Sequence, residues 1–458
     1  MAKRDIDTAS RERALTAKVS RRTVAKVAAA APVVAAAGPL HTALAAPAVR
    51  PETRVRFQDK TKISFWSHTH PPMVDQNEKM IASFMEANPD IEVDYQIIPN
   101  NNFAEKMLTS MSTGTGPDII NMDDNAMRSI YISKGLVSEV DPAALGYTSL
   151  DELKAAYIPT AFEGATMDGK IYGLPSEFNV TAFAINTAAF AEAGLDPESP
   201  PKTWEEVGTM GQKLVVKDGD TITRRGFDFL YLHSGWYQTQ FGTLLQQTGG
   251  RVVSEDGTKA VVNEPEGVAA LQIWFDMVYT YKVADPNVAT RESTNPYQDF
   301  IDGKVAMTLF NPWGMGLVTE DSAVFDNYSI VPLPQVDPAK PVDPLYAYYW
   351  SLNSQSKNKE AAFKLIAHLA SDPGDWLANV DFIQPKKGWT TSPAAAEFAF
   401  SDVWASEMEQ GKFLSTSPNF QQINEIMKSA IESCILNQVP PQEALAQAAD
   451  QINGVLGG

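Results

Sequence analysis

Short apolar runs alternate along the chain with segments whose apolar residues recur every three or four positions. The first run, 63–66, precedes a segment that places Met80, Ile81 and Phe84 on one helical face. Strand-like runs follow at 91–97 and 118–122. Because helices and strands alternate in this way, the sequence predicts an α/β fold built on a parallel sheet.

Residues 168–207 combine several of these signals. Asp168-Gly169 predicts a turn between two strands, and Gly173-Leu174-Pro175 predicts a corner. Residues 182–185 are all apolar, which indicates a strand buried on both faces, and a short helix follows it. We interpret the whole stretch as a crossing from one lobe of the protein to another.

Later segments repeat this organisation. Thr203 and Glu206 form the capping-box pattern of a helix start, and residues 268–281 form a strongly amphipathic helical pattern. Residues 330–344 are rich in Val and Pro, which predicts a second extended crossing, and the loop at 384–388 predicts a third.

The length of the chain predicts two lobes, because roughly 410 residues exceed the ~250–300 that a single hydrophobic core supports. We assign residues 60–175 and 345–384 to lobe 1, residues 176–334 and 388–458 to lobe 2, and hinge segments near 175–179, 334–345 and 384–388.

The N-terminal residues 1–45 have the pattern of an export signal. A basic segment containing Arg21-Arg22 precedes a mildly apolar run over 27–38, and Ala43-Leu44-Ala45 supplies a small-x-small cleavage site. Paired arginines before a weakly apolar run resemble a twin-arginine signal. No Cys follows the run as an acceptor for lipid, so we expect a periplasmic protein without a lipid anchor, with residues 46–59 as a flexible arm.

Charge and cysteine content narrow the function further. Without residues 1–45 the chain keeps 29 basic and 53 acidic residues, a net charge of −24, which argues against nucleic acid or an anionic membrane as partner. Cys434 is the only cysteine, so an intramolecular disulfide is excluded. It lies on an apolar stripe of helical spacing, where we predict a core residue rather than a nucleophile.

Two polar clusters follow predicted strands, namely His68-Thr69-His70 and Asp123-Asp124-Asn125. In open α/β sheets ligands bind beyond the carboxyl ends of the strands, so both clusters are candidate ligand positions on one rim.

Several motifs occur in a specific order: GTGPDI at 114–119, GKIYGLP at 169–175, AINT at 184–187, PKTWEE at 201–206, GKVAM at 303–307 with Pro312-Trp313, and SKNKEAA at 356–362. Together they resemble extracellular solute-binding protein family 1, the maltose-binding-protein-like receptors of ATP-driven sugar importers. The resemblance extends from about residue 63 to residue 453.

This resemblance implies two α/β lobes of the periplasmic-binding-protein fold (type II-like), each a mixed, mainly parallel sheet flanked by helices. It implies that a carbohydrate, either a mono- or oligosaccharide or a sugar alcohol, binds between the lobes and is delivered to the membrane permease of an ABC importer. Such a receptor binds without turnover. We therefore expect no enzyme activity, no cofactor, no metal and a monomer.

The resemblance also suggests ligand-binding positions. Trp313 matches the family's stacking aromatic, and Asn179 matches a position that often holds an acid or amide; an Asn there weakens any claim of maltose specificity. Asp123 and Asp124 match an acidic strand end, where a helix N-cap is the competing role for either. The candidate ligand-binding residues are Trp313, Asp123, Asp124, Asn179, Glu177, His68, His70, Trp236, Tyr237, Tyr349 and Trp66.

Other functions remain open. His68 and His70 with one of the aspartates would suit a hydrolytic zinc site, and Glu177 with an aspartate would suit a glycosidase. The same fold also binds polyamines or glycerol-phosphate-type solutes, and a phosphate would favour the basic pair Lys386-Lys387. The abundance of amide and aromatic side chains without a basic motif favours carbohydrate.

Overall fold

The structure is a computed structural model that describes residues 60–230, 234–285, 287, 295–414, 417 and 419–457, without the side chains of 100–102 and 234–239. The predicted export signal and arm lie outside the described residues. Residues 58–458 belong to one compact unit. Among the described helices, none is both long enough and apolar enough to span a bilayer.

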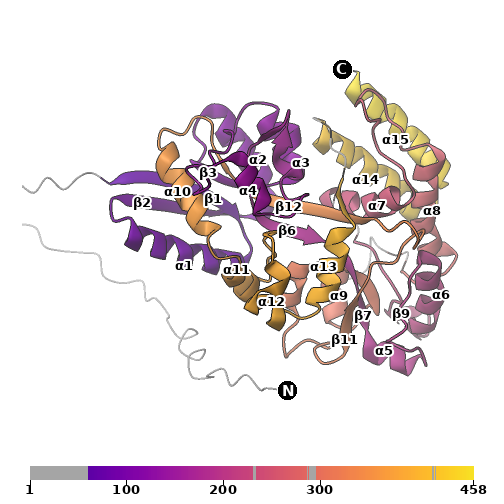
Figure 1. Cartoon of the computed structure of the whole chain (residues 1–458). Helices are drawn as coiled ribbons and strands as arrows, with labels where there is room; N and C mark the ends of the chain where they lie inside the picture. Colours follow the sequence, from indigo (N-terminus) through magenta and orange to yellow (C-terminus); the bar gives the residue numbers. More distant parts are fainter. Residues whose placement is uncertain are drawn as a thin grey trace, which may run out of the picture. The chain divides into compact units, whose positions relative to one another are not determined.

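The larger sheet has the strand order β13-β12-β3-β1-β2, and β6 also pairs with β12 (Figure 1). Its strands are β1 Thr61–His68, β2 Ile91–Ile98, β3 Ile119–Asp123, β6 Leu174–Val180, β12 Asp343–Leu352 and β13 Gly411–Phe413. Strand β1 runs parallel to β2 and β3, because α1 (Pro71–Ala87) and α2 (Asn100–Thr113) return the chain after β1 and β2. Strand β12 runs antiparallel to β3 and β6. The predicted alternation of strands and helices is thus confirmed in this half.

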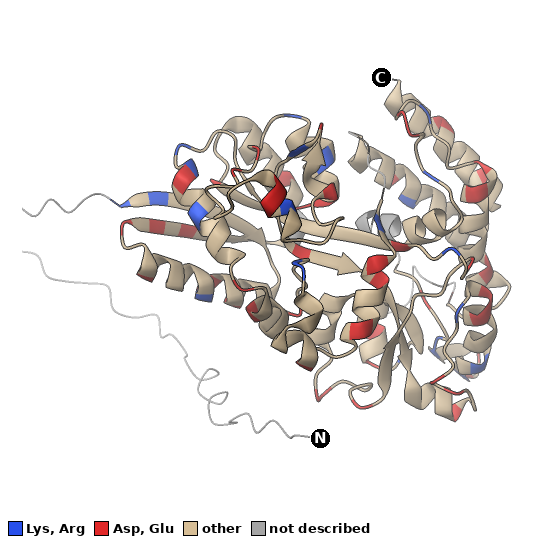
Figure 2. Cartoon of the chain, in the orientation of Figure 1, with Lys and Arg blue, Asp and Glu red and all other residues tan. Residues whose placement is uncertain are grey.

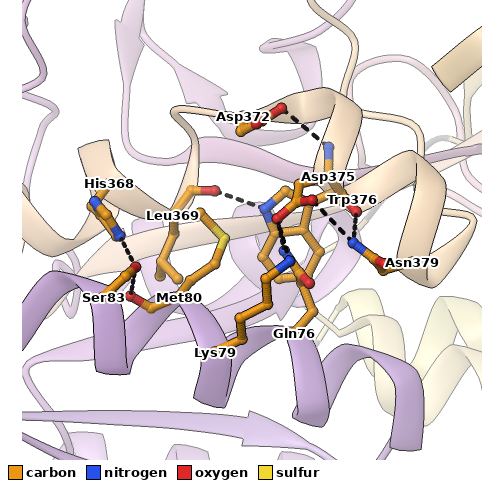
Figure 3. A network of polar contacts seen from close by, with 10 residues as sticks. All are labelled: Gln76, Lys79, Met80, Ser83, His368, Leu369, Asp372, Asp375, Trp376 and Asn379. Atoms are coloured by element: carbon orange, nitrogen blue, oxygen red, sulfur yellow. Dashed lines mark hydrogen bonds and ion pairs between the residues drawn. The ribbon is translucent and has the colours of Figure 1, made fainter. Parts of the chain in front are cut away.

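Helix α1 packs against α10 (Lys359–Leu369) and α11 (Pro373–Val380) through the polar network in Figure 3. Asp375 accepts hydrogen bonds from Lys79 at 2.7 Å and from Gln76 at 3.1 Å. The Trp376 indole donates to the carbonyl of Leu369 at 2.7 Å. The two hydrogen bonds to Asp375 join segments almost 300 residues apart in sequence and hold α1 against α11.

The stretch 168–207 connects the two sheets. The hairpin of β4 (Thr166–Met167) and β5 (Lys170–Ile171) turns at Asp168-Gly169, both with positive φ, as a two-residue hairpin requires. Strand β6 then belongs to the larger sheet, and β7 (Ala182–Asn186) belongs to the smaller one. The chain therefore passes between the sheets at Thr181. The lobe boundaries assigned from the sequence stay a prediction.

The smaller sheet has the order β10-β7-β11, with β10 Met307–Phe310 and β11 Tyr328–Val331 on either side of β7. All residues of β7 are buried, as predicted. Both pairings are antiparallel, which differs from the expectation of a mainly parallel sheet. The apolar pattern shows that a strand is buried, but its direction depends on the route of the chain, which the pattern does not reveal.

Helices around the smaller sheet are α5 Thr187–Glu192, α6 Trp204–Leu214, α7 Ser234–Gln247, α8 Pro265–Tyr279, α9 Pro296–Ile301, α14 Phe420–Asn437 and α15 Pro441–Leu456. The predicted capping box starts α6: the Thr203 side chain accepts from the Glu206 amide, and the Glu206 carboxylate accepts from the Thr203 amide. Cys434 is fully buried on α14, which confirms a core role. Figure 2 shows Asp and Glu on helices and loops around both sheets.

The remaining elements are short. They are α3 Asp124–Ala126, η2 Met127–Ile132, α4 Leu150–Ala155, η3 Glu163–Ala165, β8 Val216–Asp218, β9 Thr221–Arg224, η4 Pro312–Leu317, η5 Trp389–Thr391, α12 Pro393–Glu397 and α13 Ser401–Glu409. One hydrophobic cluster, which includes Phe178 of β6 and Phe310 of β10, spans both sheets. This shared core holds the two sheets together near the crossing.

Candidate functional site

A tyrosine on the central strand β12 lies between two carboxylates from the neighbouring strands. Tyr348 pairs with Asp123 of β3 on one side and with Glu177 of β6 on the other. Directly opposed residues of antiparallel strands have side chains on the same face, with Cβ atoms about 4.5–5.5 Å apart. Asp123 and Tyr348 are half-buried, whereas Glu177 is only 4% exposed. The three strands therefore form an acid-tyrosine-acid row on one face of the sheet.

A second row lies one step along the same strands. Tyr346 of β12 pairs with Asn179 of β6, and the Asn179 amide donates a hydrogen bond to the Glu177 carboxylate. The indole Nε1 of Trp313 donates to the Tyr346 hydroxyl at 2.6 Å. Trp313 comes from η4, which follows β10 of the smaller sheet. Elements of both sheets thus contribute to one group of side chains.

Trp313 is held in place from the side opposite the tyrosines of β12. The ring of Tyr297 lies 5.3 Å from the Trp313 ring, and the Tyr297 hydroxyl donates to Asn311 at 2.6 Å. Asn311 in turn donates to the carbonyl of Val180, at the point where the chain leaves β6. Because Pro312 begins η4 directly after Asn311, the backbone turns there and directs Trp313 toward Tyr346.

His68 completes the group from the end of β1. Its ring lies 4.9 Å from Tyr348 and 5.6 Å from Phe103 of α2. Its Nδ1 atom is buried and has no hydrogen-bond partner. Burial lowers the pKa of His68 to about 4, so the ring is neutral at pH 7. We call His68, Asp123, Glu177, Asn179, Trp313, Tyr346 and Tyr348 the Tyr348 cluster.

The carboxylates of the cluster are held in an environment that disfavours charge. Burial raises the pKa of Glu177 to about 7, and the hydrogen bond from Asn179 only partly opposes this. Burial also raises the pKa of Asp123. The hydrogen bond that Asp123 accepts from the Ala126 amide, as N-cap of α3, opposes this rise. The cluster therefore offers carboxyl oxygens, an amide and aromatic rings, which can bind hydroxyl or amine donors and cover apolar ring faces.

Asp124, Tyr349 and Trp66 of the predicted ligand residues do not join the cluster. Asp124 is fully buried and accepts from the Ala347 amide at 3.1 Å and from Arg128 at 3.3 Å. The hydroxyl of Tyr349 donates to the carbonyl of Ala161. Trp66 is 9% exposed and lies under the Lys106 ammonium group, 4.8 Å from the ring centroid.

His70 lies beside the cluster but faces α1. Its Nδ1 accepts a 3.4 Å hydrogen bond from the Met73 amide as the N-cap of that helix, and its ring lies 5.1 Å from Phe382. Trp236 and Tyr237 belong to α7, but their side chains lie outside the described residues.

Comparison with known proteins identifies the family. The model of the family described as bacterial extracellular solute-binding protein matches residues 71–376, which is more than half of the chain. The chain belongs to this family. The resemblance predicted from the sequence motifs is thereby confirmed.

Individual relatives of this solute-binding protein are distant but cover nearly the whole chain. A galactooligosaccharide-binding protein of Bacillus subtilis is 23% identical over 433 residues, covering 92% of this chain and 93% of the relative. The sn-glycerol-3-phosphate-binding periplasmic protein of Escherichia coli is 24% identical over 449 residues, covering 91% and 98%.

A solved structure establishes the fold. An ABC substrate-binding protein of Listeria monocytogenes, in complex with cycloalternan, superposes with a TM-score of 0.75 at 21% identity, covering 87% of this chain and 100% of that one. The two-lobed periplasmic-binding-protein fold predicted from the sequence is thus confirmed.

The solute-binding protein also contains a cavity of about 550 Å³ apart from the Tyr348 cluster. It is lined by Arg128 and Glu163, by the C-terminal half of α7 and by α14, and by Phe413 of β13. Phe413 stacks edge-on against Phe178, which alternates with Glu177 along β6. The cavity therefore lies on the opposite face of β6, and its lining includes no member of the cluster.

The zinc-site alternative gains no support from the arrangement. His68 faces Tyr348, whereas His70 caps α1. Among the described residues, no three His, Cys, Asp or Glu side chains come together as they would around a metal ion.

The sequence interpretation omitted Tyr346, Tyr297 and Asn311 from the solute-binding protein's candidate residues. Tyr346 had a usable signal, because it precedes Tyr348 by two residues on a strand and must share its face. Tyr297 and Asn311 had none, since their contacts with each other and with Trp313 depend on how α9 packs against β10.

Proposed function

We propose that this protein is the solute-binding receptor of an ABC importer, and that it captures a carbohydrate at the Tyr348 cluster between its lobes. The solute would be a mono- or oligosaccharide or a sugar alcohol. The observation that carries the proposal is that Trp313, from η4 after the smaller sheet, bonds Tyr346 on the strand that also holds the Asp123-Tyr348-Glu177 row of the larger sheet.

The chemistry of the cluster suits a sugar. Glu177, Asp123 and Asn179 supply acceptors and an amide donor for ring hydroxyls. Trp313 and Tyr348 are half-buried aromatics, whose faces cover the apolar side of a pyranose ring. Exclusion of water when the lobes approach each other would strengthen the polar contacts.

The family membership supports the remaining parts of the proposal. We infer that the exported chain, freed of residues 1–45 by signal cleavage, works in the periplasm as a monomer without a lipid anchor. It would deliver its solute unchanged to a membrane permease, so it would act by binding and not by catalysis.

The main alternative is a solute of another class on the same fold. One relative is named for binding sn-glycerol-3-phosphate, which is a phosphate ester. A phosphate needs cationic partners, yet the Lys386 ammonium donates to the carbonyl of Ala370 and lies over the Tyr157 ring. These contacts place Lys386 apart from the Tyr348 cluster. A polyamine is the second alternative, because it would suit the carboxylates.

A thermal-shift screen tests the proposal. Sugars, sugar alcohols, polyamines and glycerol phosphates would be added separately to the purified chain, since a ligand that binds only the folded state raises its melting temperature. We expect a shift with a carbohydrate. A shift with a polyamine or phosphate ester alone would contradict the proposal, and conversion of the bound sugar, followed by mass spectrometry, would contradict the absence of catalysis.

The variant Trp313→Ala tests whether the sugar binds at the Tyr348 cluster. We expect about a tenfold loss of affinity, equivalent to about 1.4 kcal/mol, for the sugar found in the screen. Folding should persist, because Trp313 is half-buried. Unchanged affinity per folded molecule would show that Trp313 is a packing residue and not a ligand contact.

A further inference from the structure

The Tyr348 cluster combines two carboxylates with no cation to pair with them among the described residues. Neither Glu177 nor Asp123 makes one of the ion pairs found in the described part of the chain. The Glu177 carboxylate receives a hydrogen bond from the neutral amide of Asn179, and Asp123 receives one from a backbone amide. An ionised carboxylate in such a buried position is unfavourable unless something supplies positive charge.

The bases nearest to the cluster leave Glu177 without a positive charge beside it. Burial lowers the pKa of His68 to about 4 and also lowers the pKa of His70. Arg128 forms its ion pair with the buried Asp124 and also donates to the carbonyl of Leu414. Its charge only partly opposes the effect of burial on the pKa of Asp123.

We propose that the solute carries a protonated amine beside its hydroxyl groups, as an amino sugar does, and that the amine binds Glu177 and Asp123 against the ring of Tyr348. This inference rests on the proposed function and narrows its substrate class. The two carboxylates flank Tyr348 on neighbouring strands, so an ammonium group above the ring would lie between them.

Each part of an amino sugar has a matching group in the cluster. The ammonium group has three donors, which two carboxylates and the face of a tyrosine can accept together. The ring and its hydroxyls fit Trp313 and the Asn179 amide, as for any sugar. A neutral hydroxyl at the same position would not stabilise the ionised form of Glu177, whose pKa burial raises to about 7, and a phosphate or carboxylate would be repelled by Asp123.

The experiment compares sugars that differ only in the amine. Isothermal titration at pH 6.5, where the amines are protonated, would use glucosamine against glucose, galactosamine against galactose, and the β-1,4-linked glucosamine disaccharide against cellobiose. Spermidine and sn-glycerol-3-phosphate complete the set. We expect the amine member of at least one pair to bind tenfold or more tightly than its neutral partner.

Two variants assign the preference to the cluster. Glu177→Gln should lower the affinity for the amino sugar more than that for its neutral partner, so that their affinity ratio falls at least tenfold. Asp123→Asn should lower the ratio in the same direction, because it removes the negative charge. The start of α3 should persist, since Asn still accepts the N-cap hydrogen bond. Glu205→Gln is the matched control, since it removes one negative charge from an exposed position on α6 and should leave the ratio unchanged.

The outcomes separate this inference from the proposed function. Neutral sugars that bind as tightly as their amine partners would overturn the inference and leave the carbohydrate receptor intact. An amine preference that survives in Glu177→Gln and Asp123→Asn would also overturn it. Binding of spermidine or glycerol phosphate with no sugar of either series would contradict the proposed function, and the inference with it.

Discussion

Replacement of Glu177 by Gln should stabilise the protein at alkaline pH. Glu177 is 4% exposed, and burial raises its pKa from 4.5 to about 7. Between these two values the folded state holds a proton that the unfolded state has lost. The stability contributed by this group is therefore present below pH 4.5 and is lost as the pH rises through 7. The loss corresponds to about 3 kcal/mol of unfolding free energy.

Urea unfolding of the wild-type chain and of Glu177→Gln at pH 4.5 and pH 8 measures this effect. At pH 4.5 the two proteins should have similar stability, since Gln resembles the protonated acid and still accepts from the Asn179 amide. At pH 8 the variant should be more stable by about 3 kcal/mol. Other buried acids with raised pKa values, such as Asp124 and Glu407, are present in both proteins, so their effects cancel in the difference.

A difference between the two proteins that does not change with pH would refute the reasoning. It would mean that the carboxylate is ionised in the fold at no cost, through water or a partner. A gain in stability together with weaker solute binding would instead show that Glu177 is kept for function. Residues that bind a ligand commonly lower the stability of the folded protein.

Three further predictions test the fold. Gly169→Ala should lower the free energy of unfolding by about 1 kcal/mol, because φ at Gly169 is +76° and no atom lies near the added methyl group. Gly454 has equally open surroundings but lies within α15, so Gly454→Ala should leave the stability measured by urea unfolding unchanged or raise it. Thr203→Ala should cost about 1 kcal/mol in the same assay through loss of the α6 cap. Two residues labelled in Figure 3 should differ in their effect on the free energy of unfolding. Lys79→Met should change it by less than about 1 kcal/mol, because the Lys79 side chain is 59% exposed. Trp376→Ala should lower it by about 3–5 kcal/mol, because Trp376 is buried.

Local features of the fold could be predicted because neighbouring residues determine them. The turn at Asp168-Gly169, the buried strand of residues 182–185, and the cap of Thr203 with Glu206 each depend on a few adjacent side chains and their backbone angles. The antiparallel direction of β10 and β11 could not be predicted. It depends on long connections between the strands, which an apolar pattern does not describe.

The cluster was predictable only in part, because it comes from β1, β3, β6, η4 and β12. Alternation along β6 places Glu177 and Asn179 on one face without any structure. Which of Asp123 and Asp124 shares that face depends on the pairing of β3 with β12, which places Asp123 beside Tyr348. Asp124 instead accepts the Ala347 amide. Strand register therefore decides which of two adjacent residues faces the cluster, and a single sequence does not determine that register.

A crystal structure of the protein with the sugar selected by the thermal-shift screen tests the central claim most directly. The proposed function predicts the sugar ring against Trp313 and Tyr348, with its polar groups bonded to Glu177 and Asp123. A sugar bound in the 550 Å³ cavity between Arg128 and α14, with the Tyr348 cluster unchanged, would contradict it.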